Sequence, residues 1–185
     1  MDLRIVGGHR ALDLANTVEP RVPGMVERDH LSDPAALLAW AQFAGVLDEA
    51  EAKQVESTDE MLADVREIRA LVDDTLAGRR LDALAERWAA AMGRAKLVPA
   101  GDGPATLAVG TEPATMIGDR LADALVDLLR HADLSRLRTC PLEDGGCGWY
   151  FLDRSRNQSR KWCAIDDCGT HAKSRRLTER RRARR

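Results

Sequence analysis

All four cysteines of this 185-residue chain lie in one short stretch near its C-terminal end. Six residues separate Cys140 from Cys147, four separate Cys163 from Cys168, and fifteen lie between the two pairs. Zn²⁺ binds four thiolates in a tetrahedron with zinc–sulfur distances of about 2.3 Å, and two loops that each supply two cysteines meet this requirement. The spacing therefore predicts a structural zinc site, in which four protein ligands leave no open position for catalysis.

Other interpretations of the cysteines are weaker. Two disulfides are disfavoured because Asp2, Arg4 and Arg10 interrupt any secretory signal, and the cytosol keeps thiols reduced. Thiols that merely fill a core are disfavoured by the polar sequences EDGG and RNQSRK around them, and free or redox-active thiols remain a minor alternative. His171 is an alternative ligand if one cysteine stays out of the site. We expect a cytoplasmic protein, since the chain lacks a stretch of about 18 apolar residues.

The residues between the two cysteine pairs indicate how the site is built. GWYFLDRS has the composition of a strand, RNQS that of a turn, and the second pair lies where a helix is expected to begin. A cysteine knuckle, a hairpin and a helix in this order form a treble clef. We therefore predict a treble-clef-like zinc finger over residues 135–185.

The same C-terminal stretch is strongly basic. Up to Leu134 the sequence holds 14 basic and 24 acidic residues, a net charge of −10, whereas the remainder holds 14 and 6, a net charge of +8. This asymmetry is typical of a region that binds a polyanion. On a C-terminal helix, Lys173, Arg176 and Arg180 would share one face.

Nucleic acid is the predicted partner of this basic stretch. Lysine and arginine neutralise phosphates, and small polar side chains add hydrogen bonds to phosphate oxygens. The alternative is a solvated charged tail, which zinc anchoring at its start disfavours. The residues predicted to contact DNA are Arg154, Arg156, Asn157, Ser159, Arg160, Lys161, Thr170, His171, Lys173, Arg175, Arg176 and Arg180.

Residues 1–134 have the patterns of a mainly helical domain. DPAALLAWAQFAG begins with an N-cap Asp33 and with Pro34 at the first helical position, and the segment from Ser57 to Gly78 starts with a capping box and repeats apolar residues along one face. Further helices are expected over 81–95 and 113–131, with a β-hairpin around AGDGP between them. The fold class is therefore mainly α (α+β), a helical bundle with a small hairpin followed by the zinc finger.

Asp13 and Asn16 in the N-terminal stretch GGHRALDLANTVEPR lie beside the apolar face of a short helix. They predict either a pocket for a small-molecule ligand or ordinary capping and surface polarity. No paired base, nucleophile or phosphate-binding loop accompanies them, so we do not expect an enzyme.

The segment CGWYFLDRSRNQSRKWCAIDDCGTHAK resembles the CGNR zinc-finger family, whose signature is an aromatic-x-Asp-x-Ser-basic-Asn-x-Ser-basic-basic-Trp-Cys run followed by Cys-Gly-Asn-Arg. The run is present here as Phe151, Asp153, Ser155, Arg156, Asn157, Ser159, Arg160, Lys161, Trp162 and Cys163. Upstream, ALDLANTV and DPAALLAWAQFAGVL resemble the ABATE domain that precedes this finger. The resemblance implies a bacterial, stress-related transcription regulator with a zinc-dependent DNA-binding C-terminus.

One position departs from the family signature. Thr170 and His171 stand where the family has asparagine and arginine. The missing arginine removes a bidentate contact to phosphate or guanine, so the expectation of sequence-specific readout is weaker than that of zinc binding.

Two hypotheses from different functional classes follow. The first is a zinc-dependent DNA-binding regulator whose acidic N-terminal part senses a ligand or forms a homodimer. The second is a zinc-stabilised protein-interaction adaptor whose basic finger docks on an acidic partner, such as the acidic part of a second copy. An enzyme that uses the Asp13 and Asn16 region ranks last.

Overall fold

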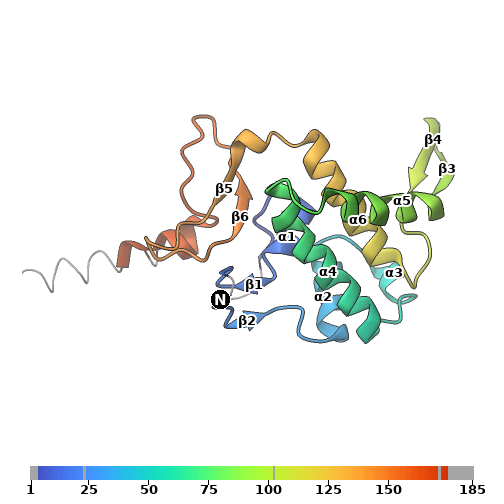
Figure 1. The fold of residues 1–185 in the computed structure, drawn as a ribbon, viewed down its shortest axis with the longest axis horizontal. Coiled ribbons are helices and arrows are strands. Elements are labelled where there is room, and N and C mark those ends of the chain that lie inside the picture. The colour runs from blue at the N-terminus through green and yellow to red at the C-terminus, as the bar shows by residue number, and fades with distance from the viewer. Residues whose placement is uncertain (1–3, 23, 102, 171, 175–185) are drawn as a thin grey trace, which may run out of the picture. The chain divides into compact units, whose positions relative to one another are not determined.

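The computed structural model describes residues 4–22, 24–101, 103–170 and 172–174 (Figure 1). Contacts divide the chain into two compact units. The helical body consists of residues 30–132, and the finger unit combines the residues up to Asp29 with those from Asp133 onward. The predicted boundary after Leu134 lies close to the second junction, but in space the first 29 residues belong with the C-terminal part.

The helical body contains five α-helices and one β-hairpin among its described residues. They are α2 (Pro34–Phe43), α3 (Glu49–Ala52), α4 (Asp59–Leu76), α5 (Leu81–Arg94), β3 (Lys96–Ala100), β4 (Gly103–Ala108) and α6 (Met116–His131). Helices α4, α5 and α6 pack against one another. The predicted fold class, mainly helical with a small hairpin, is confirmed.

The core of the body comes from apolar stripes that repeat every three or four residues. Val65 and Ile68 of α4 and Leu121 and Leu125 of α6 are fully buried. Each such side chain stabilises the fold by roughly 1.5–3 kcal/mol relative to an exposed one. The helical periodicity of the sequence therefore predicts both the helices and the faces they bury.

The starts of two helices test the predicted caps. The Asp33 carboxylate accepts a hydrogen bond from the Ala36 amide at 2.8 Å, and Pro34 occupies the first turn of α2, as predicted. The predicted capping box at Ser57 is wrong. The Ser57 hydroxyl donates instead to the Pro34 carbonyl at 2.6 Å, and the cap of α4 passes to Thr58.

The hairpin between α5 and α6 extends away from the helices (Figure 1). Strands β3 and β4 are antiparallel, with Leu97 opposite Leu107 and an irregularity between Val98 and Ala100. Helix α6 begins at Met116, slightly later than the predicted start at residue 113.

Arg120 of α6 joins three segments of the body. Its guanidinium binds both carboxylate oxygens of Glu51, at 2.7 and 2.5 Å, and donates to the Val46 carbonyl at 2.7 Å. Hydrogen bonding from Arg120 lowers the pKa of Glu51 to about 2. This ion pair holds α3 on α6.

The finger unit contains short elements from both ends of the sequence. They are α1 (Arg10–Ala15), β1 (Val18–Glu19), β2 (Arg28–Asp29), the 3-10 turn η1 (Leu134–Arg136), β5 (Leu137–Thr139), β6 (Tyr150–Leu152) and the π-helical turn η2 (Ile165–Gly169). Strands β5 and β6 are antiparallel, with Arg138 opposite Phe151. Residues 170 and 172–174 continue as helix, and the predicted basic helix beyond them lies outside the described residues. Within the described residues, no helix is both long and apolar enough to cross a bilayer.

Candidate metal centre

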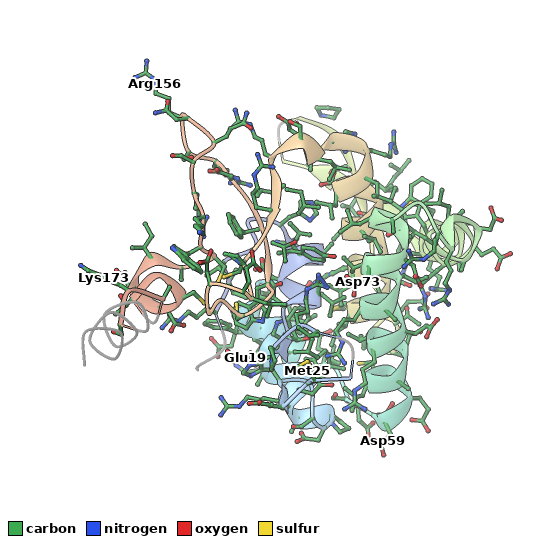
Figure 2. All side chains as sticks on the ribbon, turned by 60° about the vertical axis from the view of Figure 1, so that its left-hand side comes forward. Glu19, Met25, Asp59, Asp73, Arg156 and Lys173 are labelled. Carbon is green, nitrogen blue, oxygen red and sulfur yellow. The ribbon has the colours of Figure 1, made fainter. Side chains whose placement is uncertain are left out.

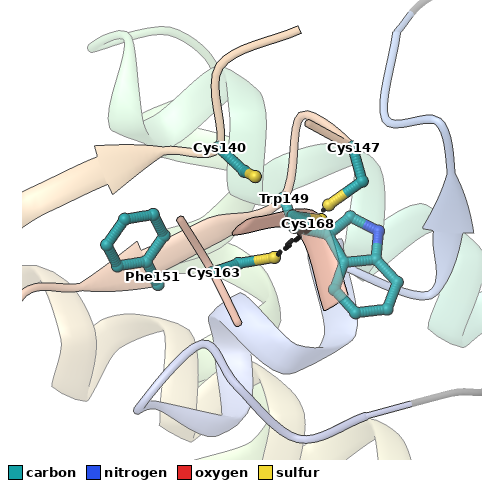
Figure 3. Packing of buried hydrophobic residues seen from close by; sticks show 6 residues of the cluster. All are labelled: Cys140, Cys147, Trp149, Phe151, Cys163 and Cys168. Carbon is teal, nitrogen blue, oxygen red and sulfur yellow. Dashed lines mark hydrogen bonds between the residues drawn. The ribbon is translucent and has the colours of Figure 1, made fainter. Parts of the chain in front are cut away.

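The four cysteine side chains converge on one point of the finger unit (Figure 3). Cys140 directly follows β5, Cys147 precedes β6, and Cys168 belongs to η2. All four are buried, and their sulfur atoms lie within 4.8 Å of one another. The fold therefore brings together the two cysteine pairs that the sequence marked as one set of ligands.

The sulfur–sulfur distances fit a tetrahedral metal ion. The Cys163 sulfur lies 3.4 Å from that of Cys147 and 3.6 Å from that of Cys168. Zinc–sulfur bonds of about 2.3 Å in a regular tetrahedron place sulfurs about 3.8 Å apart, whereas a disulfide places them about 2.05 Å apart. The four cysteines are free thiols, so the donor set matches zinc and not two disulfides. A bound ion would supply a structural cross-link between the two pairs.

Packing four thiols together perturbs their ionisation. Hydrogen bonding with Cys147 lowers the pKa of the Cys140 thiol, and hydrogen bonding with Cys140 raises the pKa values of Cys147 and Cys163. Four thiolates cannot coexist at this distance without a compensating cation. A divalent ion offsets two of the four negative charges and favours the deprotonated, ligating form.

Glycines make the first cysteine knuckle compact. A Cβ at Gly146 would lie 2.6 Å from the Cys140 sulfur and 2.7 Å from the Pro141 carbonyl. Backbone bonds from Cys140 to the Trp149 carbonyl at 2.9 Å and from Gly148 to the Cys140 carbonyl at 3.1 Å close the turn. The chain can pass this close to a ligand sulfur only because Gly146 has no side chain.

Arg160 and Lys161 are bound by other groups of the finger, Arg160 beside the second cysteine pair and Lys161 beside the first. The Arg160 guanidinium donates to the Trp162 carbonyl at 2.9 Å and to the Cys163 carbonyl, and it lies 4.6 Å from the Phe151 ring centre. The Lys161 ammonium pairs with Asp144 at 2.5 Å. Both cations are therefore engaged by the finger itself.

The loop between β6 and the second pair, residues 154–160, is called the tip loop. Its base is held by the buried Asp153 carboxylate, which accepts from the Ser155 amide at 2.8 Å and the Arg160 amide at 3.0 Å. Hydrogen bonding from the Ser155 side chain, together with these two backbone amides, lowers the pKa of Asp153. Arg156 extends outward from the far end of the loop (Figure 2), so the signature residues divide into those that hold the loop and those that it presents.

The structure places the predicted DNA-contacting residues in three groups. In the first group, the side chains are bound within the finger unit. Arg154 donates to the Gly8 carbonyl at 2.7 Å, and the Thr170 hydroxyl donates to the Ile165 carbonyl at 3.3 Å. Arg160 and Lys161, described above, also belong to this group. The exposed group, whose side chains have no hydrogen bond or ion pair to any described residue, is Arg156, Asn157, Ser159 and Lys173. The remaining group, which lies outside the described residues, is His171, Arg175, Arg176 and Arg180.

Asp13 and Asn16 are used inside the finger unit. Both are buried; the Asp13 carboxylate accepts from the Gly7 amide at 2.7 Å, and the Asn16 side chain makes two hydrogen bonds to the backbone of Tyr150. Burial raises the pKa of Asp13 to about 6. Asn16 is also the C-cap residue of α1, as the capping interpretation predicts, whereas the burial of both side chains differs from the predicted surface polarity. The ligand pocket at these two residues stays a prediction.

The sequence patterns also missed Arg136. Its guanidinium donates to the Asp153 carbonyl at 3.1 Å and to the Ser155 carbonyl at 3.3 Å, and so braces the base of the tip loop. No motif marks such a residue, because its partners are carbonyl groups that every residue carries.

A separate groove of about 800 Å³ lies in the helical body between α4, α5 and α6. Ion pairs line it: Arg87 with Asp64 at 2.5 Å, and Arg94 with Asp119 at 2.5 Å. Asp119 is almost fully buried, and its bond to Arg94 raises the pKa of that guanidinium. Asp13 and Asn16 do not contribute to this groove.

The fold and the four-thiol site define a two-part protein with a helical body and a metal-binding finger. A family model described as CGNR zinc finger matches residues 136–181, and the ABATE family model, described as "Putative stress-induced transcription regulator", matches residues 8–132. The chain belongs to the ABATE family and carries a CGNR zinc finger, which confirms the resemblance drawn from the sequence. No curated protein matches the chain.

Proposed function

We propose that this protein is a zinc-dependent DNA-binding transcription regulator of the bacterial cytoplasm. The observation that carries the proposal is a closed four-thiol centre whose tip loop and first helical residues present uncommitted polar and basic side chains, Arg156, Asn157 and Lys173 among them. The zinc ion fixes the position of both segments. It has a structural role and takes no part in a reaction.

The contacts within the finger support some of the predicted DNA-contacting side chains over others. Arg160 and Lys161 are occupied by carbonyl and carboxylate partners, so binding DNA through them would cost the finger those bonds. Arg156 and Lys173 are exposed and can neutralise phosphates at no such cost. The Asn157 amide can donate to a phosphate oxygen, and it can donate to or accept from a base edge. Arg175, Arg176 and Arg180 are proposed to extend this basic surface.

The helical body is proposed to regulate the finger. It holds 10 basic and 18 acidic residues, a net charge of −8, and is therefore repelled by nucleic acid. Its groove between α4, α5 and α6 is the proposed effector site, and self-association through the body is a second route to regulation. Neither role requires catalysis, and we assign the protein no enzymatic step.

The proposal is tested by metal analysis combined with DNA binding. Full-length protein and the Cys163→Ser variant are titrated against duplex and single-stranded DNA at two salt concentrations. If about six phosphates are neutralised, log K falls with log salt at a slope near −5 for the zinc-loaded protein. The proposal is rejected if the DNA affinity of the wild-type protein does not change with salt concentration, or if the zinc-free variant binds DNA with the same affinity as wild type.

The exposed arginine of the tip loop provides a residue-level test. Arg156→Ala is expected to weaken binding several-fold and to reduce the salt slope by about 1. Arg130→Ala is the matched control, because Arg130 is an exposed arginine of the helical body. Equal affinities for the two variants would show that Arg156 does not contact DNA.

The charge difference between the units favours one alternative function. The finger unit holds 18 basic and 12 acidic residues, a net charge of +6, and could bind an acidic protein surface such as the body of a second copy. Sedimentation distinguishes the two functions. The adaptor is selected if self-association requires zinc, disappears when residues 136–185 are removed, and is accompanied by absent DNA binding.

A further inference from the structure

The N-terminal residues 4–21, called the N-terminal clamp, cover the second edge of strand β6. One edge of β6 pairs with β5. On the other edge, the Leu152 amide donates to the Gly7 carbonyl at 2.9 Å. A strand edge left bare would present unpaired backbone groups, so the clamp completes the hydrogen bonding of the finger's central strand.

Asn16 pairs with this edge in the manner of a neighbouring strand. Its Oδ1 accepts from the Tyr150 amide at 2.8 Å and its Nδ2 donates to the Tyr150 carbonyl at 2.8 Å. The side chain is fully buried, so both bonds are shielded from water. Asp13 holds the adjoining turn by accepting from the Gly7 amide at 2.7 Å.

The clamp also reaches both cysteine pairs. At the first pair, the Arg21 amide donates to the Cys147 carbonyl at 2.9 Å, and the Trp149 indole donates to the Val18 carbonyl at 2.8 Å. Near the second pair, Arg4 lies 3.5 Å from the carboxylate of Asp167, the residue before Cys168. Val6 packs against the buried cluster that contains the four thiols.

We infer that the N-terminal clamp is a structural part of the metal centre, so that the finger is folded from both ends of the chain and metal binding is coupled to clamp docking. The two family matches assign residues 8–132 and 136–181 to separate regions. The contacts instead make the helical body an insertion within the finger unit, with both chain connections leading into elements that support the cysteines. The inference rests on the metal site and not on DNA binding.

Asn16 acts as a positioning residue, because it holds β6 and touches no thiol. Removing it takes two hydrogen bonds from the Tyr150 backbone at this edge of β6. Supporting residues of metal sites typically contribute 10–100-fold to affinity. Asn16→Ala in the full-length, zinc-loaded protein is therefore expected to release zinc to an excess of chromogenic chelator about tenfold faster than wild type.

A matched variant separates this effect from a general loss of stability. Ile68→Val removes one methylene from the core of the helical body, far along the chain from the cysteines, and is expected to lower the melting temperature while leaving the zinc release rate unchanged. If Asn16→Ala releases zinc at the wild-type rate, or if Ile68→Val accelerates release as much, the clamp has no specific role at the metal centre.

Hydrogen exchange on the wild-type chain tests the reverse coupling and does not depend on a variant that folds. Stripping zinc with a chelator is expected to abolish amide protection at residues 11–17, as well as at 150–152, while residues 62–76 of α4 stay protected. Retained protection of residues 11–17 in the zinc-free protein would overturn the inference. A failure of DNA binding alone would leave both readouts unchanged.

Discussion

The helical body and the finger unit obtain their stability from different sources. In the body, apolar side chains such as Ile68 and Leu125 are fully buried in stripes along long helices. In the finger unit, regular elements are short, and the buried cluster centres on four thiols. A small unit with few apolar residues needs an additional link, so the stability of the finger should depend on metal and that of the body should not.

Metal removal is the largest expected perturbation of this contrast. Stripping zinc, or the Cys163→Ser variant, is expected to unfold the finger unit, since structural zinc contributes on the order of 10 kcal/mol to folding in small zinc-finger peptides. The far-ultraviolet helical signal should change little, because the long helices belong to the body. If chelation removed the helical signal of the body as well as unfolding the finger unit, the two units would be one metal-dependent fold.

A cavity in the body should have the opposite effect. Leu125→Ala is expected to lower the free energy of unfolding of the body by about 2–5 kcal/mol, because Leu125 is fully buried in α6. Urea unfolding followed by the helical signal measures the loss, and bound zinc per chain should remain at one. A variant that loses its zinc along with its body stability contradicts the separation of the two sources.

Adding one methyl group at a glycine should have opposite effects in the two units. Gly146→Ala places a Cβ 2.6 Å from the Cys140 sulfur and is expected to weaken zinc binding about 10–100-fold, as measured by chelator competition. Gly93→Ala is the control, because nothing lies within 4 Å of its added Cβ in helix α5. That variant should stabilise the body by about 0.5–1 kcal/mol. Normal zinc affinity in Gly146→Ala would mean that the knuckle can relax.

The smallest expected effect is the loss of stability of the helical body at low pH. The pKa of Glu51 lies at about 2 in the fold, below its ordinary value of 4.5, so its pairing with Arg120 stabilises the body above pH 4.5 and is lost as the pH falls toward 2. Solvent screening limits the contribution to about 1 kcal/mol. Glu51→Gln should therefore be less stable than wild type at pH 7 and nearly equal to it at pH 2, whereas Glu56→Gln, at an exposed residue, should match wild type throughout. A stability difference that stays constant with pH contradicts the pairing.

The sequence predicts the body well because its information is periodic and local. Buried stripes, the Asp33 cap and the hairpin follow from spacing within a few residues. The four cysteine ligands are equally predictable from the sequence, since only a few residue types bind zinc. The capping box at Ser57 failed because a carbonyl from α2, 23 residues away, competes for its hydroxyl.

The N-terminal clamp could not be predicted from spacing. Asn16 and Tyr150 are 134 residues apart, and the bonds use backbone groups that carry no sequence signature. The same limit applies to Arg160, which counts as one more basic residue in the sequence but in the structure binds carbonyls beside Cys163. Charge counts predict the sign of a surface, whereas contacts decide which charges are available to a partner.

The most direct test of the central claim, that a metal-organised finger presents DNA-binding side chains, is a salt titration of DNA affinity on one protein sample before and after zinc removal. The zinc-loaded protein is predicted to bind with a log–log slope near −5 and to lose most of that affinity when zinc is stripped, with recovery on adding zinc back. Equal affinity and slope with and without zinc would contradict the claim.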